Sequence, residues 1–172
     1  MIAGIDVGVK KDYLAVIRDD KVVYVGELDL NLEFKFAGID APLSFPKRGY
    51  FRECEKKLQK MGIRILPPLF IREIAEKGIK IAKNLRDRNV EVFEVYPYAT
   101  RVLLSIAPHE KKRKREGMLK ILKDLREYID VPDVSSHDLI DAVISALTVK
   151  MFVEGKGEMI CGEDGCIIVP KI

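Results

Sequence analysis

The distribution of apolar and polar positions along the first forty residues predicts four short strands. Apolar runs occupy Ile2–Val7, Tyr13–Arg18, Val22–Leu28 and Phe34–Ile39, and β-rich runs of this length between turn signals are typical of strands. The polar turn Asp19–Lys21 is short enough to make the second and third runs antiparallel neighbours. The first three strands therefore form a predicted meander.

A longer amphipathic segment separates the fourth strand from a fifth. Residues Ile71–Arg88 carry apolar side chains at helical spacing with charges between them, which favours a helix that covers one face of the sheet. Val90–Val95 then alternates valine with glutamate and predicts the fifth strand. A helical crossover between two strands makes them parallel, so the fifth strand should run parallel to Phe34–Ile39.

The remaining periodic segments predict four further helices. Phe51–Met61 has helical composition and is followed by Gly62, the residue type that commonly ends a helix. A short helix is expected at Thr100–Ile106, and an amphipathic one carries Met118–Tyr128. Leu139–Phe152 is apolar at nearly every position, which predicts a buried helix.

The end of the chain resembles a β-hairpin that we expect to be peripheral. Gly162–Gly165 separates Met159-Ile160 from Ile167-Ile168-Val169. Cys161 and Cys166 flank this turn but supply only half of the four ligands of a structural zinc site, so none is expected. Glutamine is scarce while Lys, Glu and Arg are abundant, a bias reported for proteins of thermophiles. Because the cytosol of hyperthermophiles tolerates disulfides, this bias allows one between Cys161 and Cys166.

Composition narrows the class of protein only a little. The 172 residues fit one domain spanning 1–172, and 48% hydrophobic with 33% charged residues is typical of a folded globular chain. Lys and Arg outnumber Asp and Glu by 30 to 27, an excess too small to argue for a polyanionic partner. With no basic leader and no membrane-length apolar run, we expect a cytoplasmic protein, monomer or homodimer, that does not contact a membrane.

Four aspartates stand out from this apolar pattern. Asp6 lies inside the first strand, Asp40 ends the fourth, and Asp138 and Asp141 share one face of the last helix. An isolated buried carboxylate is costly and needs a partner. If the first and fourth strands are parallel neighbours with the last helix alongside, the four acids form an all-oxygen site suited to Mg²⁺ or Mn²⁺.

Each acid also has a structural explanation. Ser135-x-x-Asp138 fits a capping box, which would place Asp138 in the first helical turn without a ligand role. Asp6 fits a satisfied buried acid, Asp40 an Asx turn, and Glu94 an ion pair at a strand edge. Singly these explanations compete well, but together they require four coincidences, so we favour a common site.

Four segments in this order resemble a family of unknown function that is labelled as predicted RNase H-like nucleases. They are Gly4-Ile5-Asp6-Val7-Gly8, Gly38–Pro46, Glu94-Val95-Tyr96-Pro97 and Asp138–Leu147. The resemblance runs from Ile2 to Val169 and implies an α/β ribonuclease H-like fold. Its five-stranded mixed sheet has the order 3-2-1-4-5, with helices on both faces and a C-terminal hairpin.

The last helix also resembles the final acidic motif of RuvC-type Holliday-junction resolvases, whose acids bind the catalytic metals. The resemblance implies that Asp138 and Asp141 are metal ligands, with Asp6 and Asp40 at the positions of the first- and fourth-strand acids. The chain departs from that pattern with aspartate instead of glutamate on the fourth strand. The implied activity is two-metal phosphodiester hydrolysis with Mg²⁺ or Mn²⁺, and we add Glu94 to the catalytic candidates.

Basic residues near these motifs are candidate contacts to the phosphates of DNA or RNA, although a solvated surface explains them at least as well. They are Arg48, Arg52, Lys111, Lys112, Arg113, Lys114 and Arg115. Two other functions stay open from the sequence. One is a non-catalytic module that binds nucleic acid or a protein, and the other is a phosphate-transfer enzyme related to the actin-like ATPase fold.

Overall fold

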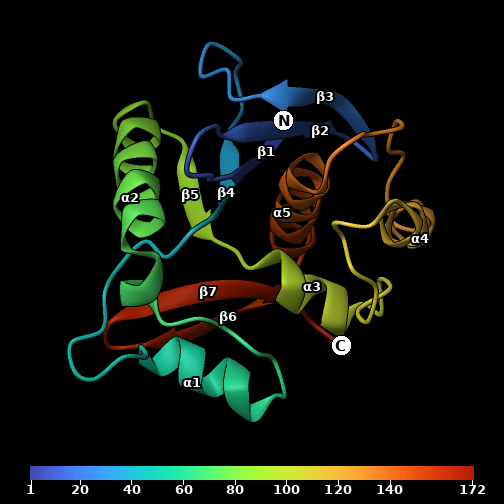
Figure 1. Cartoon of the computed structure of the whole chain (residues 1–172). Coiled ribbons are helices and arrows are strands. Elements are labelled where there is room, and N and C mark those ends of the chain that lie inside the picture. The colour runs from blue at the N-terminus through green and yellow to red at the C-terminus, as the bar shows by residue number, and fades with distance from the viewer.

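The computed structural model describes residues 1–172 (Figure 1). Its strands are β1 Ile2–Asp6, β2 Tyr13–Arg18, β3 Lys21–Glu27, β4 Phe36–Asp40, β5 Glu91–Glu94, β6 Gly157–Gly162 and β7 Gly165–Pro170. Its helices are α1 Glu53–Lys60, the 3₁₀ helix η1 Pro68–Ile71, α2 Arg72–Asp87, α3 Pro97–Leu103, α4 Arg115–Leu125 and α5 His137–Val153. No helix combines the length and the apolar character needed to cross a bilayer.

The central sheet has the order β3-β2-β1-β4-β5. β2 pairs antiparallel with both β1 and β3, whereas β4 is parallel to β1 and to β5. This arrangement confirms the predicted meander, the predicted parallel pair of the fourth and fifth strands, and the ribonuclease H-like order that the sequence motifs implied.

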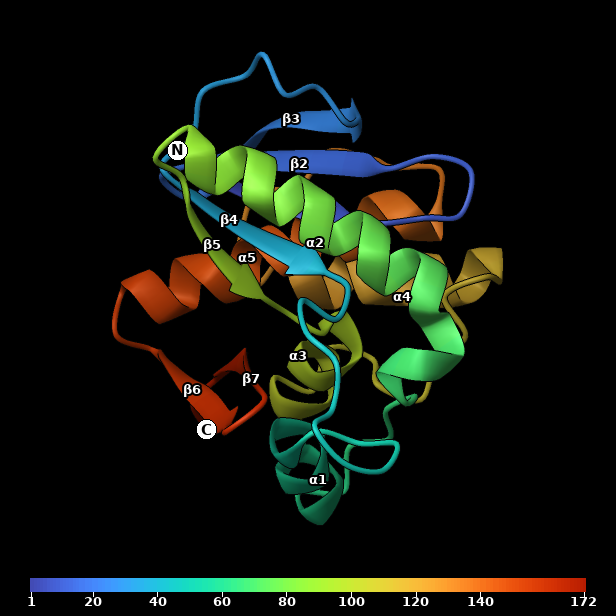
Figure 2. The same ribbon diagram turned by 90° about the vertical axis from the view of Figure 1, so that its left-hand side faces the viewer.

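Helices cover both faces of this sheet (Figures 1 and 2). α2 lies on one face, where its Ala82 and Leu85 join the buried side chains of the strands. α5 lies on the other face, with α4 outside it, and Ile121 and Leu125 of α4 pack against α5 residues such as Ile144. Because side chains alternate along a strand, Ala3, Ile5, Ala37 and Ile39 face α2, while Gly4, Asp6, Gly38 and Asp40 face α5.

Most predicted elements agree with the structure to within a few residues, and the differences have local causes. α3 begins at Pro97 rather than near Thr100, because proline is favoured at the first position of a helix. The 3₁₀ helix η1 at Pro68–Ile71 was not predicted. Gly62 follows α1 with a φ of +81°, the left-handed conformation for which glycine was expected there.

The C-terminal hairpin is integral to the molecule, which corrects the expectation that it is peripheral. Ile167 and Val169 are buried with residues of α1 and α3, and Ile168 bridges to Val95 beyond the end of β5. The Asp164 carboxylate at the hairpin turn accepts the first backbone N–H of α1, from Glu53, at 3.0 Å. The hairpin thus packs beyond the carboxyl end of β5, and a disulfide joins Cys161 to Cys166 across its two strands.

Candidate metal centre

Two of the predicted aspartates meet at the ends of the central strands. Asp6 is the last residue of β1 and Asp40 the last of β4. The two strands are parallel and in register, so Asp6 and Asp40 are direct cross-strand partners. Both side chains therefore leave the same edge of the sheet and point toward the same face.

Two glycines allow α5 to approach that face closely. A Cβ on Gly4 of β1 would lie 2.1 Å from the backbone oxygen of Ala142 and 2.2 Å from the backbone nitrogen of Ala146. A Cβ on Gly38 of β4 would lie 2.6 Å from Cγ2 of Val149 and 3.0 Å from the backbone oxygen of Ser145. α5 therefore packs closely on both strands, with its backbone directly against Gly4, and its first turns bring Asp141 over the ends of β1 and β4.

Asp6, Asp40 and Asp141 consequently form one cluster. Each offers a carboxylate oxygen, and these three oxygens lie within 4.8 Å of one another. Asp6 and Asp141 are 8% and 3% exposed, while Asp40 keeps an accessible edge. Oxygen ligands on opposite sides of Mg²⁺ are about 4.2 Å apart, so side-chain shifts of under about 1 Å would accommodate an ion. We call these three residues the carboxylate cluster.

Crowding of these carboxylates disfavours their charged forms. Burial, followed by the charges of Asp141 and Asp138, raises the pKa of Asp6 to about 7. Burial and the charges of Asp141 and Asp6 raise the pKa of Asp40 well above its usual range. Burial also raises the pKa of Asp141, although Lys112 opposes this shift. The cluster is thus short of positive charge, which a divalent cation would supply.

Three basic side chains surround Asp141 without balancing the cluster. The Lys112 ammonium forms an ion pair with Asp141 Oδ2. The charges of His137 and Arg101 act on Asp141 in the same direction, lowering its pKa. Arg101 itself is committed elsewhere, because its Nε donates to the Ile106 carbonyl at 3.2 Å and its Nη2 to the Glu110 carbonyl at 3.0 Å.

Asp138 lies beside the cluster rather than within it. Ser136 is the N-cap of α5 and its hydroxyl accepts the Leu139 backbone N–H at 3.3 Å, which corrects the capping box predicted from Ser135. Asp138 is consequently in the first helical turn, and its Oδ1 lies 2.7 Å from Nδ1 of His137. Its charge still acts on Asp6, so it borders the site without supplying one of the three grouped oxygens.

Glu94, the fifth acidic candidate, belongs to a different network. Its Oε2 accepts a hydrogen bond from Nη1 of Arg52 and one from the Leu43 backbone, both at 2.8 Å, and its Oε1 accepts from Nη2 of Arg52 at 2.5 Å. Arg52 also pairs with the buried carboxylate of Glu55 at 2.8 Å. Glu94 thus forms a buried ion pair with Arg52, in agreement with the ion pair considered for it in the sequence as the alternative to a catalytic role.

The predicted phosphate contacts divide into three groups. Arg48, Lys111, Arg113, Lys114 and Arg115 are exposed. Arg52 is fully buried in the network with Glu55 and Glu94 and does not reach the surface, which corrects its prediction as a phosphate contact. Lys112 alone of the basic run turns inward to Asp141. Sequence reasoning assigned Lys112 to the surface because its neighbours carry no sign of which lysine faces the acids.

Comparisons with known proteins find a matching family but assign no activity. A family model described as "Protein of unknown function (DUF429)" matches residues 69–165, a stretch that includes Asp138 and Asp141 but neither Asp6 nor Asp40. None of the curated proteins compared with the chain matches it. Two solved structures, Thermus thermophilus RuvC and T. thermophilus RuvC in complex with Holliday junction substrate, are each 13% identical to the chain, with a TM-score of 0.49, over 96% of it and 99% of their own length.

Proposed function

Because the chain belongs to a family described only as a protein of unknown function, DUF429, we propose its activity from the site: metal-dependent hydrolysis of nucleic-acid phosphodiester bonds. The observation that carries this proposal is the convergence of Asp6, Asp40 and Asp141 within 4.8 Å. They meet at one edge of a sheet with ribonuclease H-like strand order.

The chemistry of the cluster suits a hard divalent cation. Its donors are carboxylate oxygens, which suit Mg²⁺ and Mn²⁺, and no thiolate is near, because Cys54 is buried with α1 and α3 residues and the other two cysteines are paired. Asp6, Asp40 and Asp141 would hold the ion, with Asp138 at its border. Bound there, divalent metal would supply an activated water and stabilise charge on a phosphoryl group.

Nucleic acid is the substrate class that the surroundings favour. The exposed run at Lys111 and Arg113–Arg115 leads directly away from the cluster, to which Lys112 ties it. Lys and Arg near an acidic metal site neutralise backbone phosphates and so position a polyanion that the carboxylates alone would repel. Arg48 lies exposed on the loop that follows β4, the strand that carries Asp40.

The experiment that tests this proposal is cleavage of single-stranded, double-stranded, hybrid and branched DNA and RNA substrates with Mg²⁺ or Mn²⁺. Asp141→Asn should lower the rate at least about 100-fold, as expected when a group that acts mainly in the transition state is removed. Asp133→Asn is the matched control, because the Asp133 side chain is 97% exposed and outside the cluster. Equal rates for wild type and Asp141→Asn, or metal-dependent nucleic-acid binding with no cleavage of any substrate, would contradict a hydrolase and favour a binding module.

A further inference from the structure

Lys112 differs from every other residue of its basic run. Its side chain is 39% exposed and contacts Asp141, whose side chain is 4% exposed. Burial by itself would lower the pKa of Lys112, but the ion pair with Asp141 and the charges of Asp40 and Asp6 raise it. The ammonium therefore lies within the field of all three acids and is the positive charge that the fold itself supplies to the carboxylate cluster.

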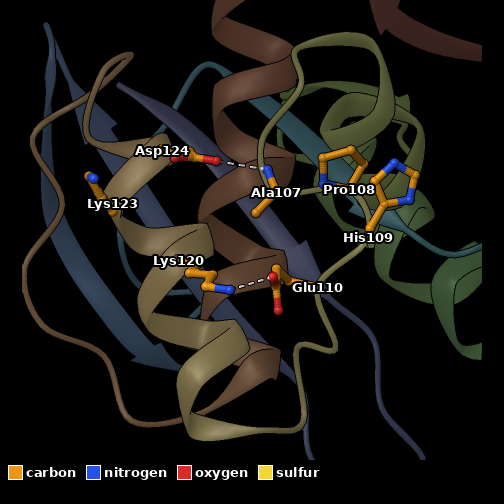
Figure 3. A pocket seen from close by; sticks show the side chains of 7 residues that line it. All are labelled: Ala107, Pro108, His109, Glu110, Lys120, Lys123 and Asp124. Carbon is orange, nitrogen blue, oxygen red and sulfur yellow. Dashed lines mark hydrogen bonds and ion pairs between the residues drawn. The ribbon is translucent and has the colours of Figure 1, made fainter.

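The segment that carries Lys112 has most of its side-chain contacts in its first half. We call residues 104–114, between α3 and α4, the strap. Its first half is fixed by Arg101, which donates to the carbonyls of Ile106, Ala107 and Glu110. Figure 3 shows two further contacts with α4: the Ala107 N–H donates to the Asp124 carboxylate at 2.9 Å, and the Lys120 ammonium donates to the Glu110 carboxylate at 2.7 Å.

The second half of the strap has far fewer contacts. Its backbone is held by one turn, in which the Lys114 N–H donates to the Lys111 carbonyl at 3.0 Å, and by the start of α4, where the Lys114 carbonyl accepts the Met118 N–H at 2.9 Å. Lys111, Arg113 and Lys114 are exposed, and Lys112 is the only residue of residues 111–114 whose side chain forms an ion pair. The side-chain contact that holds this half against the acids is therefore the ion pair between Lys112 and Asp141.

A divalent ion and the Lys112 ammonium compete for the same carboxylate. Both are cations that must approach Asp141 closely, and a metal ion beside a lysine ammonium in a poorly solvated site is strongly repelled by it. Metal at the cluster would therefore weaken the one side-chain contact that holds the second half of the strap against the acids.

We propose that Lys112 is an internal counter-ion of the metal-free protein, exchanged for a divalent ion, and that residues 111–114 move away from the acids when metal binds. The inference rests on the proposed metal site but not on cleavage. It makes Lys112 a residue that sets metal affinity, and it couples metal binding to the position of the basic run.

The first test compares Mg²⁺ and Mn²⁺ binding by calorimetry for wild type, Lys112→Met and Lys114→Met. Lys112→Met should bind metal at least about 10-fold more tightly, because no ammonium has to leave, and it should melt at a lower temperature than wild type without metal. Lys114→Met, the matched control in the same run, should match wild type within about twofold. Equal or weaker metal binding by Lys112→Met overturns the inference.

A second measurement uses the wild-type chain alone, so a folding defect cannot imitate the result. Hydrogen exchange of the backbone amides of residues 111–114 should become several-fold faster with saturating Mg²⁺, while amides of β1 should not. Unchanged or slower exchange in the strap overturns the inference. The proposed function fails separately, if no metal binds to wild type or if Asp141→Asn binds it as tightly as wild type does.

Discussion

The ends of two neighbouring strands carry buried acids that have opposite fates. At the end of β5, Glu94 shares a single arginine with Glu55, and hydrogen bonds from Arg52 and Leu43 occupy both oxygens of its carboxylate. At the end of β4, Asp40 joins Asp6 and Asp141, and the one cation that pairs with the cluster is Lys112, through Asp141. The carboxylate of Glu94 thus has all its partners within the protein, whereas the three carboxylates of the cluster share a single ammonium.

This difference separates a structural acid from a candidate ligand better than burial does. Glu94 and Asp6 are 7% and 8% exposed, so exposure does not distinguish them. Burial raises the pKa of each, but Arg52 and the Leu43 N–H oppose the shift at Glu94, while Asp141 and Asp138 add to it at Asp6. A buried carboxylate whose oxygens are all hydrogen-bonded within the protein, such as Glu94, supports the fold. A buried carboxylate without such partners, such as Asp6, can still bind a ligand.

The largest expected effect comes from removing Arg52, the cation shared by Glu55 and Glu94. Arg52→Met leaves the buried carboxylates of Glu94 and Glu55 without their cation, and breaking a buried ion pair from one side typically costs about 3–5 kcal/mol. Urea denaturation should show this loss in the free energy of unfolding. Arg48→Met, at an exposed position of the same loop, should change it by under about 0.5 kcal/mol. A loss below about 1 kcal/mol for Arg52→Met would mean that the network is not what distinguishes the two groups.

The second prediction concerns the pH dependence of the metal-free protein. Because the pKa of Asp6 rises from 3.8 to about 7 on folding, the folded state binds this proton more tightly than the unfolded state. Its contribution to stability is therefore greatest near pH 4 and is lost as the pH rises toward 7. The loss should be roughly 2–4 kcal/mol, since the full shift of one isolated group corresponds to about 4 kcal/mol and the proton is shared within the cluster.

Asp6→Asn isolates this contribution from groups that titrate in the opposite sense. Asp20 and Glu154, for example, have pKa values lowered by Lys150, so their contribution to the stability of the protein is lost as the pH falls. Unfolding free energies measured in chelator between pH 4 and pH 8 should decline less for Asp6→Asn than for wild type. If the unfolding free energies of the two proteins changed in parallel with pH, the folded state would not raise the pKa of Asp6.

The third prediction tests which group holds metal. Wild type should gain about 2.7 kcal/mol in unfolding free energy when Mg²⁺ is present at 100 times its dissociation constant, provided that the ion binds only the folded state. Asp40→Asn should lose most of this gain, while Glu94→Gln should keep it although its metal-free stability falls. Melting curves with and without metal measure both effects. Loss of the metal gain in Glu94→Gln would return Glu94 to the list of ligands.

The smallest effect concerns the helix start that positions Asp138 and Asp141. Ser136→Ala removes the N-cap hydroxyl from α5, which should lower the unfolding free energy by about 1 kcal/mol. Ser135→Ala should change it by only a few tenths, because the Ser135 hydroxyl makes no cap contact and the residue is exposed. Urea denaturation of both variants decides between the two serines, and a larger effect of Ser135→Ala would restore the predicted capping box.

Sequence alone predicted what depends on local pattern. The β-rich apolar run Tyr13–Arg18 predicted β2 with the observed bounds, and the parallel placement of β1 and β4 brought Asp6 beside Asp40 as expected. It did not predict which cations face which acids. The path of the strap depends on Arg101 and Asp124, and the burial of Arg52 depends on packing of α1 against the hairpin. Such contacts join segments far apart in the chain and leave no periodic signal.

The main-chain contact between α5 and β1 at Gly4 bears on the ion selectivity of the proposed metal site. Since the atoms of α5 nearest to Gly4 are backbone atoms of Ala142 and Ala146, repacking side chains elsewhere should have little effect on the gap that separates Asp141 from Asp6. The reach of the carboxylates is set instead by side-chain length. Exchange of aspartate for glutamate at residue 40 is thus the simplest route by which this scaffold would shift between small octahedral ions and larger ones such as Ca²⁺.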